Sequence, residues 1–345
     1  LRTPGLIFGK GSIEFRWEPI ESVRFELSPI CGTNVFRLGA SVGQDATLNV
    51  ATNPPINLDV RVNNHHLELT AGSTPTCKLG GLASATRLDE EILCDELKFH
   101  LVNLHNYFGK RITYPSQSSA ARRIVLSDEN WEITIDGVEN LKELLDELDR
   151  DGGFAITHVG VLRNKNNKPF RVAEALEQMK LLGFFLSFVE GKWCFPKFLV
   201  GMRNEKIIVR DLSAKGRISQ WGGNWRWSPL EAHDLDLAYK GFASRWNDPH
   251  WQETIALTLE FYVRANTYHV VELSVLDSFT AMDRLASAYS LENVKPASER
   301  IRRALAIGGL ETQRPRNELC TFYEDFYRIN CPRKTAEGAT ILADF

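Results

Sequence analysis

Several histidines in this 345-residue chain occupy positions where acid–base chemistry or metal binding could be sought. His158 lies in the apolar segment FAITHVGVL, on the strand face that also carries Phe154 and Leu162. A single histidine on such a face is typical of a hydrogen-bonded core residue, and proton transfer is the functional alternative. His65 and His66 follow two asparagines at what we interpret as a hairpin tip. A metal site there would need a third ligand, and none stands nearby in the sequence.

Carboxylates are frequent between positions 139 and 151, in a pattern typical of the solvated face of a helix. Asp128 and Glu129 indicate a turn, and no pair of acidic residues is marked out for acid–base work. The glycine-rich dinucleotide fingerprint and the Walker phosphate loop are both absent from the sequence. We therefore expect neither a cofactor nor a metal.

Tryptophans are concentrated between positions 221 and 251, a stretch that holds five of the eight in the chain. They could form an aromatic platform for a sugar or a base, or a packed seam between two domains. Apolar neighbours such as Phe242 favour the seam. Trp225 and Trp246 are accordingly predicted to be structural.

The stretch from residue 295 to residue 334 is locally basic. A solvated helical surface is the simpler interpretation, and a groove for an RNA backbone is the alternative. The arginines that would line such a groove are Arg300, Arg302, Arg303, Arg314 and Arg316.

Composition indicates an ordinary globular protein, with 43% hydrophobic and 25% charged residues. The net charge of -3 gives no global attraction to nucleic acid or to an anionic membrane. The densest apolar run, residues 181–189, is too short to span a bilayer. The six cysteines form no C-x-x-C pair, which favours buried free thiols in a reducing compartment. We expect a cytoplasmic protein with no membrane segment.

The first half of the chain is predicted to be rich in β-structure, because short alternating or β-branched segments are separated by turn residues. Many short strands at this spacing suggest an antiparallel sandwich. The predicted strands cover residues 12–17, 22–27, 35–40, 47–51, 57–62, 66–70, 97–105, 124–126, 131–135, 154–162, 193–201 and 207–209. Asn63-Asn64 and Gly80-Gly81 are interpreted as turns.

Apolar residues at helical spacing predict two helices in the first half and an almost wholly helical second half. The predicted helices cover residues 138–150, 172–189, 231–242, 252–265, 269–289, 296–307 and 317–326. The fold class is therefore α+β. We predict a β-rich domain over residues 1–215, a tryptophan-rich junction over 216–228 and an all-α domain over 229–345.

The second half also resembles uncharacterised bacterial proteins with a β-rich N-terminal domain and a HEPN-like (ApeA-like) helical domain. The segments that carry the resemblance are GFAITHVGVL, FFLSFVEGKWCFPKFLVG, FYVRANTYHVVELSVLDSF and ERIRRALAIGGL, within residues 154–345. The resemblance implies a helical bundle that forms a homodimer. In active members it implies a metal-independent endoribonuclease, often of a stress, toxin–antitoxin or phage-defence system.

Such enzymes carry an arginine followed four to six residues later by a histidine, usually as Arg-Asn-x-x-x-His. The chain offers four loosely spaced pairs, Arg61/His66, Arg226/His233, Arg245/His250 and Arg264/His269. The pair Arg264 and His269 is the best placed, although Ala265 replaces the usual asparagine. The final residues read as the opening of a helix, so we expect the catalytic pair to lie beyond Phe345 and the helical domain to be truncated.

Two functions from different classes follow. The leading prediction is a cytoplasmic HEPN-family protein that targets RNA, with histidine as the general base and arginine at the phosphate. The alternative is a non-enzymatic sensor or adaptor whose β-rich domain binds a ligand or protein and whose helices dimerise.

Overall fold

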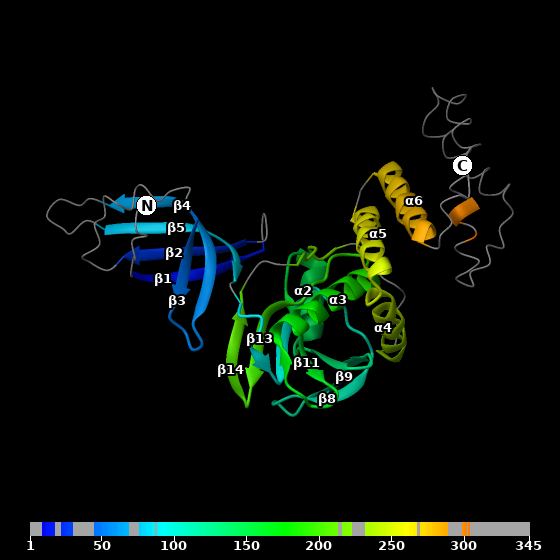
Figure 1. Ribbon diagram of the computed structural model, residues 1–345, viewed down its shortest axis with the longest axis horizontal. Coiled ribbons are helices and arrows are strands. Elements are labelled where there is room, and N and C mark those ends of the chain that lie inside the picture. The colour runs from blue at the N-terminus through cyan, green and yellow to red at the C-terminus, as the bar shows by residue number, and fades with distance from the viewer. Residues whose placement is uncertain are drawn as a thin grey trace, which may run out of the picture. The chain divides into compact units, whose positions relative to one another are not determined.

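The computed structural model describes most of the chain up to residue 303. The described residues are 9–17, 22–29, 45–68, 76–86, 88–212, 216–222, 232–267, 270–288, 299–301 and 303. Two compact units are present, Leu1–Gly241 and Phe242–Phe345. Figure 1 shows the strands of the first unit and the helices of the second. The described residues thus form an α+β protein, in which a β-rich region precedes a helical one.

The chain begins with a five-stranded antiparallel sheet in the order β1-β2-β5-β4-β3. Its strands are β1 (Gly9–Arg16), β2 (Ser22–Pro29), β3 (Asp45–Val50), β4 (Ile56–Glu68) and β5 (Thr76–Thr86). One face is apolar and buries Val23, Phe25, Ile56, Leu58, Val60 and Val62. Alternation along each strand places these side chains together, as period-two patterning requires.

The predicted hairpin tip around Asn63-Asn64 is wrong, because these residues lie inside β4. The predicted turn at Gly80-Gly81 is also wrong, since both glycines lie in β5 and pair with β4 and β2. A register irregularity between Val62 and Asn64 accommodates the asparagines without ending the strand. The predicted strand over residues 35–40 lies outside the described residues.

A seven-stranded antiparallel sheet forms the centre of the first unit, in the order β14-β13-β7-β11-β10-β9-β8. Its strands are β7 (Glu96–Val102), β8 (Lys110–Thr113), β9 (Ser119–Ser127), β10 (Trp131–Gly137), β11 (Ile156–Asn164), β13 (Lys197–Arg203) and β14 (Lys206–Asp211). A separate ribbon pairs β6 (Leu93–Cys94) with β12 (Phe170–Arg171). The sandwich-like packing of strands stays a prediction.

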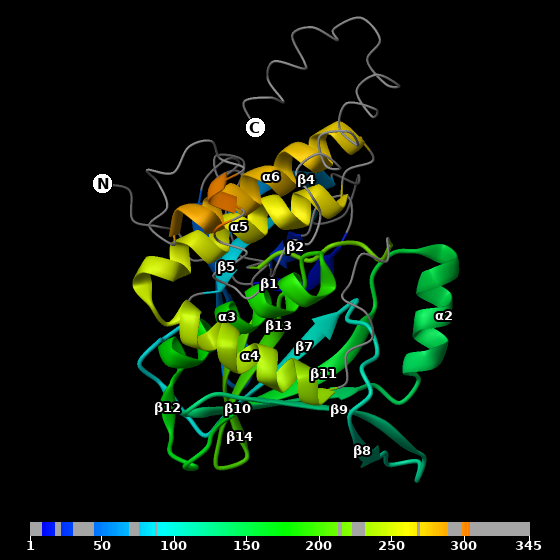
Figure 2. The same cartoon turned by 90° about the vertical axis from the view of Figure 1, so that its right-hand side faces the viewer.

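Two helices accompany the seven-stranded sheet, α2 (Leu141–Asp151) and α3 (Val172–Glu190). The α3 helix lies on one face of the sheet (Figure 2). It is apolar around most of its girth, and side chains on several sides are buried. The sheet contributes Phe99, Ile133 and Leu162 to the same core. The prediction of a helix over residues 172–189 is confirmed, with one further residue, Glu190, at its end.

Three longer helices follow: α4 (Ala232–Trp246), α5 (Pro249–Thr267) and α6 (Val271–Ala288). They confirm the helices predicted over 231–242, 252–265 and 269–289. The first part of α4 packs in the first unit, where Tyr239 meets Phe185 edge-on with ring centroids 5.2 Å apart. Residues 299–301 are helical, whereas the helix predicted over 317–326 lies outside the described residues. The predicted junction over 216–228 stays a prediction.

In the described part of the chain, no helix is both long and apolar enough to cross a membrane.

Candidate functional site

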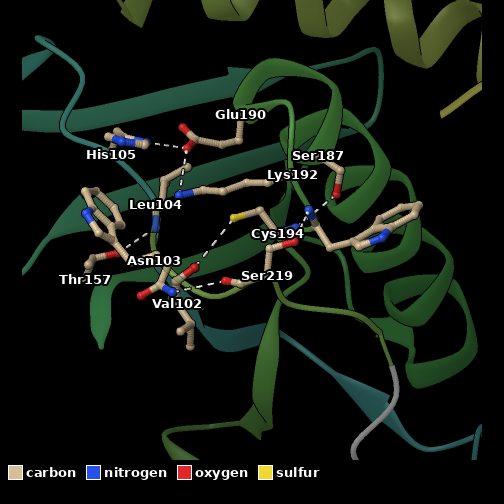
Figure 3. Close-up of polar contacts among 12 residues, drawn as sticks. Val102, Asn103, Leu104, His105, Thr157, Ser187, Glu190, Lys192, Cys194 and Ser219 are labelled. Atoms are coloured by element: carbon tan, nitrogen blue, oxygen red, sulfur yellow. Dashed lines mark hydrogen bonds and ion pairs between the residues drawn. The ribbon is translucent and has the colours of Figure 1, made fainter. Parts of the chain in front are cut away.

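A buried polar cluster lies where α3 ends, and Figure 3 shows most of its members. Glu190 is the last residue of α3, and Gly191 follows in the left-handed conformation with φ 67°. A glycine there is the usual way to end a helix. The chain turns sharply at this glycine, so Lys192 comes back toward the carboxylate that precedes it. The glycine that ends α3 therefore brings Glu190 and Lys192 together in the cluster.

Glu190 is a buried carboxylate with three basic or hydroxyl neighbours. The Tyr107 hydroxyl donates to its Oε1 at 2.5 Å, and His105 Nδ1 donates to its Oε2 at 2.5 Å. Lys192 Nζ lies 3.9 Å from the same Oε2. Burial alone would raise the pKa of Glu190, but His105, Lys192 and Tyr107 together hold this pKa below its usual value. The cluster therefore contains an ionised carboxylate inside the protein.

Trp221 seals this cluster from solvent. Its ring centroid is 4.2 Å from that of His105, and Lys192 Nζ lies 4.3 Å from the indole centroid. The indole Nε1 donates to Asp149 at 2.9 Å, which fixes the ring, and only 8% of Trp221 is exposed. An indole face favours a nearby cation, so the tryptophan both shields Lys192 and stabilises its charge.

Asn103 holds together the backbone around the cluster. It adopts the left-handed conformation with φ 58°, which asparagine tolerates better than most residues. Its amide nitrogen donates to the carbonyls of Gly153 and Ser219, and its amide oxygen accepts from Ala155 N–H at 3.0 Å. Because Asn103 follows β7 directly, this one side chain ties the sheet to two distant segments. The close-up in Figure 3 shows the contact with Ser219.

His158 is a core residue, as the simpler interpretation predicted. It is 1% exposed, and its Nδ1 lies 3.0 Å from Thr157 Oγ1. Burial lowers the pKa of His158 to about 3, so its imidazole is neutral at ordinary pH. The hairpin-tip interpretation of His65 and His66 is replaced by their backbone positions inside β4.

Cys94 and Cys194 are free and buried thiols, in agreement with the sequence-based expectation. Burial raises the pKa of Cys94 to about 12 and raises that of Cys194 further, with Glu190 adding to the effect on Cys194. A protonated thiol is a poor nucleophile. Cys194 Sγ instead donates weakly to the Val102 carbonyl at 3.8 Å. The thiol beside the cluster therefore packs as a core side chain.

The arginine of the best-placed Arg/His pair is engaged within the second unit. Arg264 Nε lies 3.2 Å from Asp277 Oδ2, and its guanidinium lies 5.5 Å from the Phe261 ring centroid. His269 lies outside the described residues. In another of the loosely spaced pairs, the Arg245 guanidinium lies 5.0 Å from the Trp251 ring centroid.

The basic tail is described only at its start. Arg300 forms an ion pair with Asp283 at 2.5 Å, and Arg303 forms one with Glu299 at 2.9 Å. The Arg303 pair is typical of a helical surface, whereas the Arg300 side chain is only 16% exposed and binds back to α6. The side chains of Arg302, Arg314 and Arg316 lie outside the described residues. RNA binding by this tail stays a prediction.

Of the clustered tryptophans, Trp221, Trp246 and Trp251 are described, and all three are buried. Buried rings support packing rather than an open platform. Trp246 stacks on Phe242 with ring planes 14° apart, inside the second unit. Trp225 lies outside the described residues.

Sequence reasoning missed the cluster around Glu190, because its members are separated by up to 116 positions. One signal was available: the ionisable Glu190 closes the apolar second half of α3, residues 181–189, and such a residue requires buried partners. The identity of those partners is a tertiary fact. Among the described residues, no group of three or more histidine, cysteine, aspartate or glutamate side chains could hold a metal. The cluster around Glu190 can fix the tautomer of His105 and can hold the charges of Glu190 and Lys192 inside the protein.

Comparison with known proteins places this cluster in a shared region. Residues 89–224 match the YopA central domain. Over 230 residues the chain is 27% identical to the SPbeta prophage-derived uncharacterized protein YopA of Bacillus subtilis (strain 168). That alignment covers 66% of this chain and 52% of the relative, so the chain spans about half the length of the curated relative it matches. No solved structure matches. The expected similarity to uncharacterised bacterial proteins is confirmed at this level.

Proposed function

We propose that this chain is a non-enzymatic sensor or adaptor that binds a ligand through its β-rich unit and a second copy through its helical unit. The observation that carries the proposal is the apolar surface of α6. Val271, Leu273, Val275 and Leu276 are 54%, 45%, 37% and 59% exposed. Several exposed apolar side chains on one short stretch of helix usually mark an interaction site.

The spacing on α6 supports association through a helix face. Leu273 and Leu276 are three residues apart, and Val271 and Val275 are four apart, so each pair forms a ridge on the helix. The two ridges lie about 150° apart around the helix, and the arc beyond Leu273 is buried, with Asp277 at 6% and Ala281 at 5% exposure. Two such ridges allow helix packing between protomers. The predicted homodimer is thus retained as part of this proposal.

Sedimentation of the full chain tests this association. We expect a concentration-dependent dimer that the double variant Leu273→Gln/Leu276→Gln converts into a monomer. The matched control is Leu237→Gln, which alters an equally exposed leucine, 54% accessible, on α4. A wild-type chain that stays monomeric at high concentration would refute the proposal. It would also be refuted if Leu237→Gln weakened dimer formation as much as the double variant does.

A second candidate function is the HEPN-like ribonuclease, in a stress or phage-defence setting and in the cytoplasm. Arg264 supports it, because this residue is 44% exposed in the last turn of α5, immediately before the break to α6. The prophage origin of the similar YopA protein is compatible with a role in phage biology. The assay is degradation of RNA by the chain without added metal. Cleavage that His269→Ala abolishes would favour this candidate over the adaptor.

A further inference from the structure

Phe108 is the most exposed large hydrophobic side chain in the part of the chain that the structure describes, at 66%. Its surroundings make this notable, because Leu104, His105 and Tyr107 are all buried just before it. The chain between β7 and β8 therefore packs tightly and leaves one aromatic ring in solvent. Gly109 follows and donates its N–H to the carbonyl of Ala121 at 3.2 Å, which anchors this segment to β9.

Basic residues continue directly from Phe108 into the edge strand β8. Lys110 and Arg111 are exposed, and no salt bridge between described residues includes either of them. The antiparallel register places Lys110 directly opposite Arg123 on β9. Arg123 makes two bonds of 2.7 Å to Asp136 on β10. Arg123 is thus paired with Asp136, and Lys110 and Arg111 add two further positive charges on the neighbouring edge strand.

Two cations placed opposite each other across neighbouring strands repel, so this arrangement costs stability. Charged residues on an edge strand can also prevent unwanted strand pairing, and that function would account for Lys110 and Arg111. Edge protection gives no reason for an exposed phenylalanine, because an apolar ring at an edge encourages association. The aromatic and the cations together require a common explanation.

We propose that Phe108, Lys110, Arg111 and Arg123 form a binding surface for single-stranded nucleic acid, here called the β8 surface. This inference rests on the proposed binding role of the β-rich unit and names its ligand class. Exposed aromatic rings stack on nucleobases regardless of sequence, and flanking lysine and arginine contact the phosphates. An acidic protein would be held by the three cations but would make no comparable use of a flat aromatic face.

The direct test is fluorescence polarisation with the full chain and labelled oligouridylate or oligothymidylate of about twelve nucleotides. We expect Phe108→Ala to weaken binding about tenfold. Lys110→Glu/Arg111→Glu should remove measurable binding. The milder Lys110→Gln/Arg111→Gln should reduce the slope of log affinity against log salt by about 1.4. A comparison of the oligouridylate and oligothymidylate affinities shows whether RNA or DNA is preferred, and binding of either supports the proposal.

Matched controls separate this surface from general electrostatics. Lys142→Glu/Lys180→Glu reverses two other exposed lysines of the same unit and should leave affinity nearly unchanged. Phe108→Tyr keeps an aromatic face and should retain binding, which would show that the ring itself is sufficient at this position. Circular dichroism of each variant checks that the fold is intact.

Three outcomes would overturn the inference. The first is that the wild-type chain binds no oligonucleotide at low salt. The second is that Lys110→Glu/Arg111→Glu and Lys142→Glu/Lys180→Glu lose equal affinity, and the third is that Phe108→Ala keeps the wild-type affinity. If polyglutamate displaces the oligonucleotide from wild type and Phe108→Ala alike, the surface recognises acidic protein instead. Sedimentation of the same samples reports dimerisation separately. A dimer that fails to bind nucleic acid refutes this inference alone.

Discussion

Glu190 in the first unit and Asp277 in the second are both buried carboxylates with a basic neighbour, but their surroundings differ. The partners of Glu190 are themselves buried, with Lys192 at 5% and His105 at 7% exposure. Asp277 is paired with Arg264, whose side chain is 44% exposed. A fully enclosed charge depends on every partner, whereas a pair open to water gains little from its attraction. In the first unit, both members of the charged pair are shielded from solvent. In the second unit, the arginine of the pair is open to water, so apolar contacts between helices contribute most of the stability.

The largest effect should follow removal of the enclosed carboxylate. Glu190→Ala leaves Lys192 and His105 buried without their anion, so we expect a loss of about 3–5 kcal/mol in unfolding free energy. Glu177→Ala is the control, since Glu177 lies on the exposed side of the same helix and should change stability by less than about 0.5 kcal/mol. Urea denaturation measures both, and hydrogen exchange in β7 and β11 assigns the loss to this unit. Equal stability of the two variants would contradict the conclusion that the enclosed carboxylate stabilises the first unit.

In the second unit, the same substitution at two positions of α5 should give very different results. Leu259 is 4% exposed and Leu257 is 39% exposed. Leu259→Ala should cost about 2–5 kcal/mol through lost burial and a cavity, and Leu257→Ala less than about 1 kcal/mol. Thermal unfolding monitored by exchange of α5 peptides provides the measurement. Similar costs at both sites would mean that the second unit has no defined core face.

Acidification should weaken the first unit through His158. Its folded pKa is about 3, against 6.5 in the unfolded chain, so the unfolded state binds the extra proton between these values. Stability is therefore complete above pH 6.5 and falls as pH drops toward 3. The expected loss between pH 7 and pH 4 is about 3 kcal/mol. The non-titrating variant His158→Gln should show a flatter pH profile, and an NMR titration in which the imidazole protonates near pH 6 would contradict the assignment.

A smaller effect is expected from a close approach inside the sheet. A Cβ atom on Gly160 would lie 2.2 Å from Phe99 Cζ, so the ring would have to move. Gly160→Ala should cost about 1–3 kcal/mol by overpacking. Phe99→Leu in the same chain should recover part of that loss, and the urea midpoints of the single and double variants test it. Additive losses would show that Phe99 is not the obstacle.

The sequence predicted helices far better than the polar cluster, for a physical reason. The α3 helix can be predicted from its own nineteen residues, because apolar side chains recur at helical spacing from Val172 onward. Strand β5 was misread because Gly80-Gly81 favours turns locally, while pairing with β2 and β4 on both sides overrides that preference. The local sequence marks Glu190 as a residue that needs buried partners, but it does not identify His105 or Trp221 as those partners. Their association depends on how the sheet, α3 and residues 216–222 come together.

The Asn103 side chain has a consequence for the order of events during synthesis. Its side-chain amide donates hydrogen bonds to the carbonyl of Gly153, 50 residues later in the sequence, and to that of Ser219, 116 residues later. Since a nascent chain emerges from its N-terminus, β7 waits for its last partner until nearly the whole first unit has been translated. Contacts of such sequence separation slow folding. A ribosome-bound chain ending at residue 212 should therefore remain protease-sensitive, and one extended well past Trp221 should become resistant.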